Sequence, residues 1–184
     1  MNPEFVAYVG LNVLSISFCI YFLLRLFAVS FANQIVSTSY KYLEPVLKTF
    51  RLVFPIIYRI DLSCLFVIIA IKVFSFFVYF SEDDLDSSFM DILIWSCFSL
   101  LLTISLIFRY SLLVSIIGSW AFPGSRNSFL MMCGSISNVL LKPFQRFTVF
   151  NGIDFSPILV FFLLIQFDNI IFNLKFYLDL PSLI

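Results

Sequence analysis

Residues 60–80 read IDLSCLFVIIAIKVFSFFVYF, an apolar run that is opened by an Asp-x-Ser element and contains a single cation, Lys72. The pattern returns at residues 153–177, which read IDFSPILVFFLLIQFDNIIFNLKFY. A helix needs about 20 apolar residues to cross the hydrocarbon core of a bilayer. Two apolar runs behind the same polar motif therefore predict membrane-spanning helices that belong to an internal repeat.

The composition also favours a membrane protein. Of the 184 residues, 61% are hydrophobic and 12% are charged, and the mean hydropathy is +1.06. Soluble domains carry about 25% charged residues. A water-facing surface cannot be built from so few charges, so we predict an all-α membrane protein. The formal net charge of +0 gives no indication of a nucleic-acid partner.

Four segments meet the length requirement for a span, namely residues 5–31, 62–80, 89–120 and 155–177. No basic region precedes the first segment and no small-residue cleavage site follows it. We therefore expect it to be retained rather than removed as a signal peptide. The four spans pair into two parallel two-helix repeats, residues 1–80 and 89–184, which are joined by the acidic residues 81–88.

The Lys and Arg residues predict how the spans are oriented, because basic connections stay in the cytoplasm. Residues 81–88 carry acidic side chains and no Lys or Arg. The connections after the first and third spans are basic, with Lys41, Lys48, Arg51 and Arg59 in one and Arg126, Lys142 and Arg146 in the other. We expect both basic connections in the cytoplasm, residues 81–88 outside it, and both termini outside as well.

Each basic connection also has the periodicity of an amphipathic helix. Its apolar residues recur at spacings of three and four and so share one helix face. They are Val36, Tyr40, Leu43, Leu47, Phe50 and Phe54 in the first connection and Phe129, Met132, Ile136, Leu140, Phe144 and Phe147 in the second. Such a helix lies in the membrane interface, where each cation near anionic headgroups contributes about 1 kcal/mol. A compatible alternative is that these helices only cover the end of the bundle.

The Asp-x-Ser elements, Asp61 with Ser63 and Asp154 with Ser156, have a local structural explanation. The first turn of a helix has unpaired N–H groups, and Asp or Ser side chains accept hydrogen bonds from them. Pro157 suits the same turn because its missing N–H costs nothing there. We expect both Asp residues to cap helices at the cytoplasmic boundary. The functional alternative is a contact point for an ion or a lipid headgroup.

The two repeats share further positions. The first contains Arg25, Asn33, Pro45, Lys48, Arg51, Asp61 and Ser63, and the second contains Arg109, Asn127, Lys142, Pro143, Arg146, Asp154, Ser156 and Pro157. Paired Asp-x-Ser endings behind basic, proline-containing segments resemble the YggT family, also called YlmG, over nearly the whole chain. The chain departs from the family pattern at Gln34, Thr49 and Ser128, where prolines are expected, and at Tyr58-Arg59, where glycines are expected.

The resemblance implies an integral protein of the bacterial inner membrane or the thylakoid. The roles proposed for the family concern osmotic or ion homeostasis, cell division and envelope organisation. In plastids they include nucleoid distribution and haem attachment to a b-type cytochrome. The resemblance supplies no catalytic residues that this chain would share.

Ionisable side chains inside the predicted spans form a second candidate site. Lys72 and Asp168 lie about 16 Å and about 21 Å beyond the Asp-x-Ser elements of their helices. Buried charges are expensive in a bilayer and are functional candidates for that reason. We expect Lys72 and Asp168 to approach each other, together with Gln166 and Asn169, and to line a path for a cation or proton. The alternative is that Lys72 snorkels and Asp168 reaches interfacial water.

Two arginines lie one to three turns inside the predicted cytoplasmic boundary, Arg25 on the first span and Arg109 on the third. A long cationic side chain in that position usually snorkels to the headgroups, and this is what we expect. The functional alternative is contact with Asp61 or Asp154.

The sequence gives little indication of an enzymatic function. The chain has no histidine, and its four cysteines are scattered through apolar stretches, so we expect no disulfide, metal, cofactor or catalytic centre. We predict a non-enzymatic scaffold or accessory factor in envelope organisation or cell division. Its expected partners are membrane lipids with anionic headgroups and other membrane or division proteins, and an oligomer is compatible with the sequence. The alternative is a component of ion transport or osmotic adaptation that uses the intramembrane charges.

Overall fold

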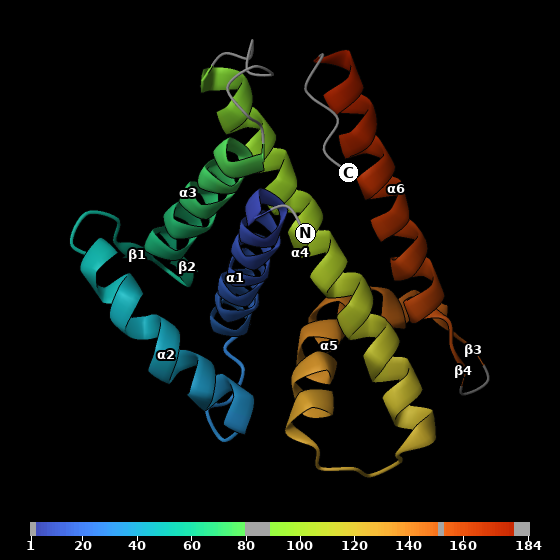
Figure 1. The fold of residues 1–184 in the computed structure, drawn as a ribbon. Helices are drawn as coiled ribbons and strands as arrows, with labels where there is room; N and C mark the ends of the chain where they lie inside the picture. Colours follow the sequence, from blue (N-terminus) through green and yellow to red (C-terminus); the bar gives the residue numbers. More distant parts are fainter. Residues whose placement is uncertain (1–2, 80–88, 151–152, 179–184) are drawn as a thin grey trace.

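The computed structural model describes residues 3–79, 89–150 and 153–178, and Figure 1 shows its fold. The first half contains α1 (Pro3–Leu26), α2 (Gln34–Phe50), β1 (Ile56–Ile57), β2 (Ile60–Asp61) and α3 (Leu62–Tyr79). The second half contains α4 (Phe89–Ala121), α5 (Ser128–Thr148), β3 (Val149–Phe150), β4 (Ile153–Asp154) and α6 (Ser156–Tyr177). Both halves therefore have the same order of elements, and the described residues are almost entirely helical, as predicted.

The two short hairpins were not predicted. In each, two antiparallel strands of two residues connect the amphipathic helix to the following apolar helix, with Ile56 opposite Asp61 and Val149 opposite Asp154. In the first hairpin the turn residue Tyr58 has φ of 55° and an almost fully exposed side chain. This is the left-handed region, which suits glycine and costs other residues about 1–2 kcal/mol. The positive φ of Tyr58 explains why the resemblance to the YggT pattern leads us to expect a glycine at this position.

The recurring asparagines begin the amphipathic helices. The Asn33 side-chain oxygen accepts a hydrogen bond from the backbone N–H of Ile35 at 2.9 Å, and Asn127 accepts one from Phe129 at 2.8 Å. Each asparagine is therefore the N-cap of its helix. Asn33 also donates to the backbone oxygen of Ser128 at 2.7 Å, which joins the starts of α2 and α5.

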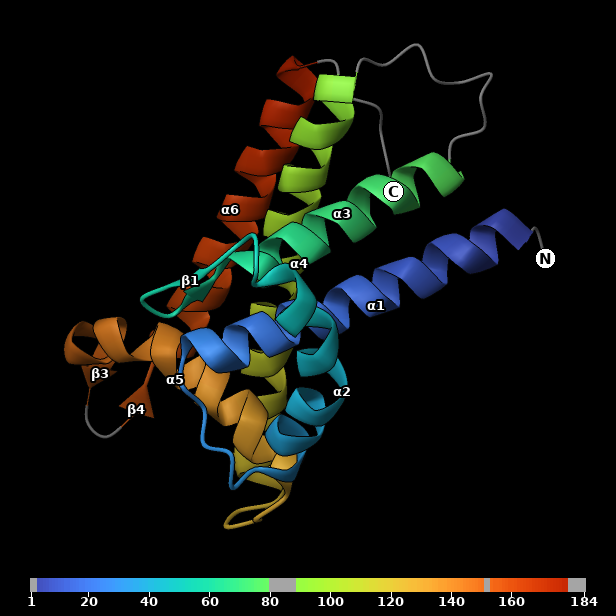
Figure 2. The ribbon, with the colours of Figure 1, turned by 90° about the vertical axis from the view of Figure 1, so that its left-hand side faces the viewer.

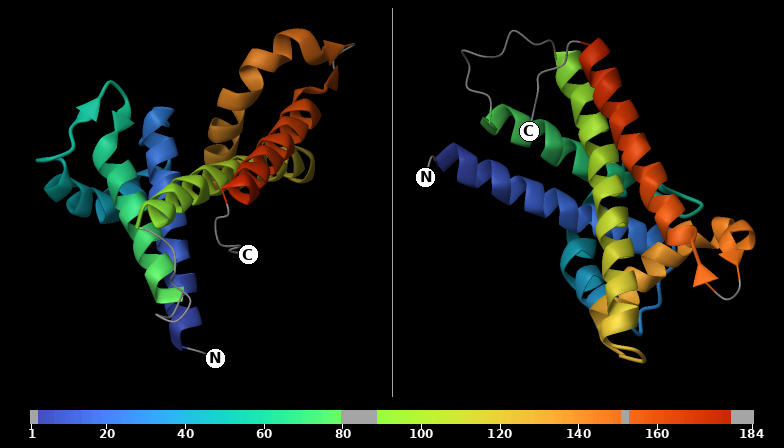
Figure 3. Two further views of the ribbon diagram at one scale, coloured as in Figure 1. Left: turned by 90° about the horizontal axis from the view of Figure 1, so that it is seen from above. Right: turned by 90° about the vertical axis from the view of Figure 1, so that its right-hand side faces the viewer.

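The apolar helices form two crossed pairs rather than one parallel bundle. α1 packs along α3, α4 packs against α5 and α6, and α3 packs against α4. Figures 2 and 3 show the α1–α3 pair running obliquely across the α4–α6 pair. Helices α2 and α5 and both hairpins lie toward the end of the molecule at which α1 and α4 end and α3 and α6 begin (Figure 1).

The core lies where α1, α3 and α4 meet. It includes the fully or almost fully buried side chains of Phe18, Leu23, Leu47, Ile68 and Ile107. A second buried cluster, with Val36 from α2 and Ile136 from α5, joins the two amphipathic helices. All four cysteines lie in the described residues, none forms a disulfide, and three of them are buried. They act as small apolar side chains, as predicted.

Within residues 3–79, 89–150 and 153–178, three helices are long and apolar enough to cross a membrane: α1, α4 and α6. Helix α3 is apolar but shorter, since its 18 residues rise about 27 Å against a hydrocarbon core of about 30 Å. The first predicted span ends earlier than expected, at Leu26 instead of residue 31. The acidic residues 81–88 and Phe80, the last residue of the second predicted span, lie outside the described residues.

Candidate functional site

The end of α1 carries a compact ionic cluster, which we call the Asp61 network (Tyr21, Arg25, Glu44, Arg51, Asp61 and Ser63). One Asp61 carboxylate oxygen, Oδ2, accepts from Arg25 Nη1 at 2.9 Å and from Arg51 Nη2 at 2.8 Å. The other, Oδ1, accepts from the Ser63 hydroxyl and from the Cys64 backbone N–H at 3.3 Å. The expected helix cap of α3 is thus confirmed, and one oxygen remains for the two arginines.

Glu44 joins helix α2 to the same cluster. Its carboxylate accepts two hydrogen bonds from the Arg51 guanidinium, one of them at 3.0 Å, and one from the Tyr21 hydroxyl. Arg25 Nη1 lies 3.8 Å from Glu44 Oε2. Two arginines therefore balance two carboxylates, and the cluster connects α1, α2 and the start of α3.

The burial and bonding of this network shift its acid–base equilibria. Burial by itself raises the pKa of Asp61, but the hydrogen bonds from Ser63 and Arg51 outweigh it, and the pKa lies below the usual aspartate value. The Arg51 hydrogen bond likewise lowers the pKa of Glu44. Hydrogen bonding to Glu44, followed by the bond to Asp61, raises the pKa of Arg51. All three groups are therefore held in their charged forms.

The second half has a polar cluster at the same place, but Asp154 is its only charged side chain among the described residues. Asp154 accepts from the Ser156 hydroxyl, from the Ser156 backbone N–H at 2.8 Å and from Gln145 Nε2 at 3.1 Å. The Ser156 hydroxyl bond lowers the pKa of this exposed aspartate. Arg51 lies 18 positions after Asn33 and Gln145 lies 18 positions after Asn127, so Gln145 replaces the arginine. By the same count, Asn138 replaces Glu44.

The two predicted arginine contacts have different outcomes. Arg25 binds Asp61, so the alternative contact is confirmed for this arginine and the expectation that it snorkels is wrong. The alternative contact between Arg109 and Asp154 is also wrong, since Arg109 Nη2 lies 2.9 Å from Asp168 Oδ2. The reason is the length of α4, whose 33 residues place Arg109 more than three turns before the helix end, whereas Arg25 lies in the last turn of α1.

Apart from Arg51, the candidate basic residues of the amphipathic helices lie at the surface. Lys48 on α2 and Lys142 and Arg146 on α5 are exposed. Lys142 and Arg146 line a shallow hollow of about 390 Å³ together with Val139, Pro143 and Phe147. These exposed cations suit contact with headgroups, which remains a prediction.

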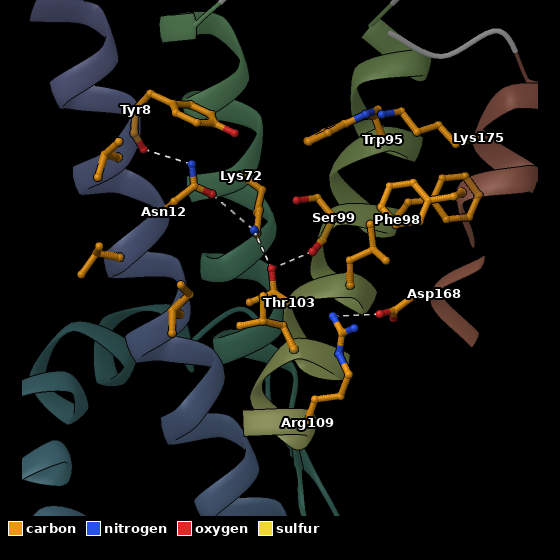
Figure 4. Close-up of a pocket in the computed structure, with 16 residues that line it drawn as sticks. Tyr8, Asn12, Lys72, Trp95, Phe98, Ser99, Thr103, Arg109, Asp168 and Lys175 are labelled. Carbon is orange, nitrogen blue, oxygen red and sulfur yellow. Dashed lines mark hydrogen bonds and ion pairs between the residues drawn. The ribbon is translucent and has the colours of Figure 1, made fainter. Parts of the chain in front are cut away.

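A cavity of about 430 Å³ lies between α1, α3, α4 and α6 and contains the predicted intramembrane charges (Figure 4). Lys72 Nζ donates to Thr103 Oγ1 at 2.8 Å and to Asn12 Oδ1 at 3.5 Å. Asp168 is paired with Arg109 on the neighbouring helix α4. Lys72 and Asp168 thus line one cavity, but they do not bind each other, so the predicted pairing is wrong.

Other details of the intramembrane prediction also change. Gln166 and Asn169 are exposed and do not line the cavity. The alternative that Lys72 snorkels and Asp168 reaches interfacial water is wrong too, because both side chains are buried. Sequence reasoning missed Lys175, whose Nζ lies over the Trp95 ring at 5.6 Å from its centre. The available signal was its spacing of seven residues from Asp168, which is two helix turns.

The arrangement suits positioning and binding more than reaction chemistry. Within the described ranges, no three His, Cys, Asp or Glu side chains gather as the ligands of a metal ion would. The buried ionisable side chains Asp61, Lys72 and Asp168 belong either to the Asp61 network, where opposite charges bind one another, or to the cavity.

Comparison with known proteins identifies the family. The sequence profile of the CCB3/YggT family matches residues 4–81 and again residues 94–175. The chain belongs to this family. An uncharacterized protein of Haemophilus influenzae is 31% identical over 147 residues, which cover 79% of this chain and 78% of the relative. The uncharacterized protein PA0392 of Pseudomonas aeruginosa is 28% identical over 155 residues, covering 83% and 79%. No solved structure matches the chain significantly.

The CCB3/YggT membership confirms the resemblance found in the sequence. The two matched ranges coincide with the two halves of the structure, one on each side of residues 82–93. Neither relative's description names an activity, so the family by itself does not assign a function.

Proposed function

We propose that this CCB3/YggT protein is a non-enzymatic scaffold or accessory factor of the bacterial inner membrane, acting in envelope organisation or cell division. The observation that carries the proposal is the Asp61 network. It binds the amphipathic helix α2 to the ends of α1 and α3 through charge-assisted hydrogen bonds. A surface held rigidly on such a support is what a scaffold requires.

The topology that goes with this proposal has four spans. Helices α1, α4 and α6 are long enough to cross the bilayer. The shorter helix α3 crosses it where the bilayer thins locally to match the length of the helix. Helices α2 and α5 then lie in the cytoplasmic interface, and residues 81–88 and both termini lie outside the cytoplasm. The basic residues Lys48, Lys142 and Arg146, all exposed, support this orientation.

The proposed partners are anionic lipids and a membrane or division protein that docks on α2. A photo-crosslinking residue at Tyr42, which is exposed on α2, tests for the protein partner, and Phe162, exposed on α6, is the matched control position. We expect a discrete protein adduct from Tyr42 that is lost in an Asp61→Asn variant. If Tyr42 and Phe162 give the same adducts and a deletion strain divides normally, the scaffold proposal is wrong.

Ion transport is the second candidate, and the cavity with Lys72, Arg109 and Asp168 is the observation that favours it. A conducting path needs polar groups along its whole length. The buried cluster next to the cavity is instead formed by apolar side chains such as Phe18 and Ile107. Potassium and proton flux into liposomes decides the point: flux that disappears in both Lys72→Leu and Asp168→Leu would establish transport and displace the scaffold proposal.

A further inference from the structure

A row of amide side chains runs along the outer face of helix α6. Gln166, Asn169 and Asn173 are all exposed, in a helix that is long and apolar enough to cross a membrane. Their spacing of three and four residues places them on one face of the helix. At 3.6 residues per turn, this face lies nearly opposite the buried residues Asp168 and Ile171. The three amide residues, which we call the amide stripe, therefore point away from the rest of the described chain.

The position of α6 makes the amide stripe face lipid. The helix packs against α4 and α5 and lies at one edge of the molecule (Figure 1). In the proposed topology α6 enters the membrane near Ser156. Gln166 and Asn169 then lie about 15 Å and about 20 Å along the helix, well inside a hydrocarbon core of about 30 Å. Amide side chains are too short to reach the headgroups from that depth.

The amide stripe lacks hydrogen-bond partners in the described part of the chain. A polar group without a partner is costly in a bilayer, because no water is available there. The internal repeat does not require these amides. The positions 12 and 15 residues after Asp61 are Val73 and Phe76, whereas the same counts from Asp154 give the first two amides of the stripe. The stripe is therefore a feature of α6 alone that needs a partner with both donors and acceptors.

A second copy of this chain meets that requirement. A carboxamide has an NH₂ donor and a carbonyl acceptor, so two identical amides can bind each other reciprocally. Two copies in one membrane have the same topology, and a twofold axis along the membrane normal places the same residues at the same depth. All three amides of the stripe then meet their counterparts at once. The helix of another protein would need polar groups at the same three heights.

The residues that continue the stripe along α6 also suit a helix–helix contact. Leu159 and Phe162 before it and Phe176 after it are exposed and extend the alternating spacing of three and four. This is the spacing of a helix seam in a coiled coil, where a polar residue fixes the register and the number of helices. The charged residues of the helix, Asp168 and Lys175, are buried, so no like charges face each other across such a seam.

We propose that two copies of this protein associate side by side in the membrane through the outer face of α6. The amide stripe forms the polar centre of the interface, where each amide donates a hydrogen bond to the same amide of the second copy. Because the interface uses the same surface on both copies, the association stops at a dimer. The proposal concerns a face that the scaffold proposal does not use, since that one depends on α2.

Energy transfer between donor-labelled and acceptor-labelled copies of the full chain, in liposomes of increasing lipid-to-protein ratio, measures the association. We expect Gln166→Leu and Asn169→Leu each to raise the dimer dissociation constant about threefold to tenfold, and the double variant to raise it more than about tenfold. Asn138→Leu makes the same change at an exposed amide on α5 and is the matched control, with no expected effect. Equal transfer in the wild type and the double variant would overturn the proposal.

Two further measurements separate an interface from a role in the fold. Gln166 and Asn169 are exposed in the single chain, so their Leu variants are expected to keep the wild-type Tm in a detergent that holds the protein monomeric. Asn169→Gln keeps an amide at the same position and is expected to retain most of the association. If the Leu variants lower the Tm of the monomer, the amides support the fold and the proposal is wrong.

Disulfide crosslinking identifies the face that makes the contact. Cys97→Ser provides the background, because the other three cysteines are buried. Phe162→Cys lies on the seam, whereas Phe167→Cys is exposed on another face of α6 and is the control. We expect oxidation in membranes to join two copies through Phe162→Cys only. Equal crosslinking at both positions would indicate random collision, and a crosslink from Phe162→Cys to a different protein would contradict the second copy.

The dimer and the scaffold proposal can fail separately. In the photo-crosslinking experiment, Phe162 is expected to give an adduct of two copies of this chain, which differs in mass from the adduct expected at Tyr42 on α2. Loss of the Tyr42 adduct alone argues against the scaffold proposal. Loss of the Phe162 adduct alone argues against the dimer.

Discussion

The two halves of this molecule share an order of elements, but their equivalent aspartates have different hydrogen-bond and ion-pair partners. In the first half, Asp61 is fully buried and binds two arginines. In the second half, Asp154 is exposed and binds Gln145 and Ser156. Both aspartates accept a backbone hydrogen bond from the first turn of the helix that follows, so this bond is the shared role and the ionic network is an addition. One half attaches its amphipathic helix through ion pairs between arginines and carboxylates, and the other attaches it through a hydrogen bond from the neutral Gln145 amide to Asp154.

The largest expected effect is the loss of the Asp61 carboxylate. Asp61→Asn leaves two partly buried arginines with one carboxylate between them, and removing one partner of a buried ion pair costs about 3–5 kcal/mol. The equivalent change, Asp154→Asn, removes an exposed charge and is expected to cost less than about 1 kcal/mol. Thermal unfolding of both variants in the same detergent measures the contrast. Equal shifts in Tm would show that the two halves do not differ in this way.

A double-mutant cycle tests whether Glu44 and Arg51 act as a unit. The changes Glu44→Asn and Arg51→Gln give the first half the residues of the second, Asn138 and Gln145. Because the two side chains bind each other, we expect a coupling free energy of about 1–2 kcal/mol between the changes. Chemical unfolding of the two single variants and the double variant measures it. Additive effects would mean that Glu44 and Arg51 contribute independently.

Lowering the pH is expected to destabilise the fold of the first half, because Asp61 and Glu44 become protonated. The pKa values of Asp61 and Glu44 are lowered in the folded protein, so their stabilising effect is complete above the unfolded pKa values, which are about 4. It is lost as the pH falls below about 4 toward the folded values. We expect Tm to decline over that window and to decline less steeply in the Glu44→Asn, Arg51→Gln double variant. Parallel pH profiles for the two proteins would contradict this assignment.

The smallest effect concerns the turn of the first hairpin. Tyr58 has a positive φ and an almost fully exposed side chain, so Tyr58→Gly relieves backbone strain and removes little packing. Glycine also adds freedom to the unfolded chain, which offsets part of the gain. We expect a net stabilisation of about 0.5–1 kcal/mol, seen as a small rise in Tm. Arg59→Gly, at the neighbouring turn residue, is the control and should not stabilise the protein.

Several features of the protein were determined by the sequence alone, because they depend on residues close together in the chain. The apolar runs predicted the helices α1, α3, α4 and α6, and the spacing of apolar residues predicted α2 and α5. The Asp-x-Ser elements predicted hydrogen bonds to the first turns of α3 and α6. Each of these depends on helix periodicity or on contacts within three residues, which local sequence specifies.

Only the tertiary structure decided which charges meet. Lys72 contacts Thr103 and Asn12, and Asp168 contacts Arg109, because the α1–α3 pair crosses the α4–α6 pair instead of running parallel to it. The long helix α4 places Arg109 more than three turns before its end, where it meets Asp168 on α6 instead of Asp154. Crossing geometry follows from how side-chain surfaces of distant segments pack, and that information is spread over many residues. The cavity between α1, α3, α4 and α6 is a consequence of that packing.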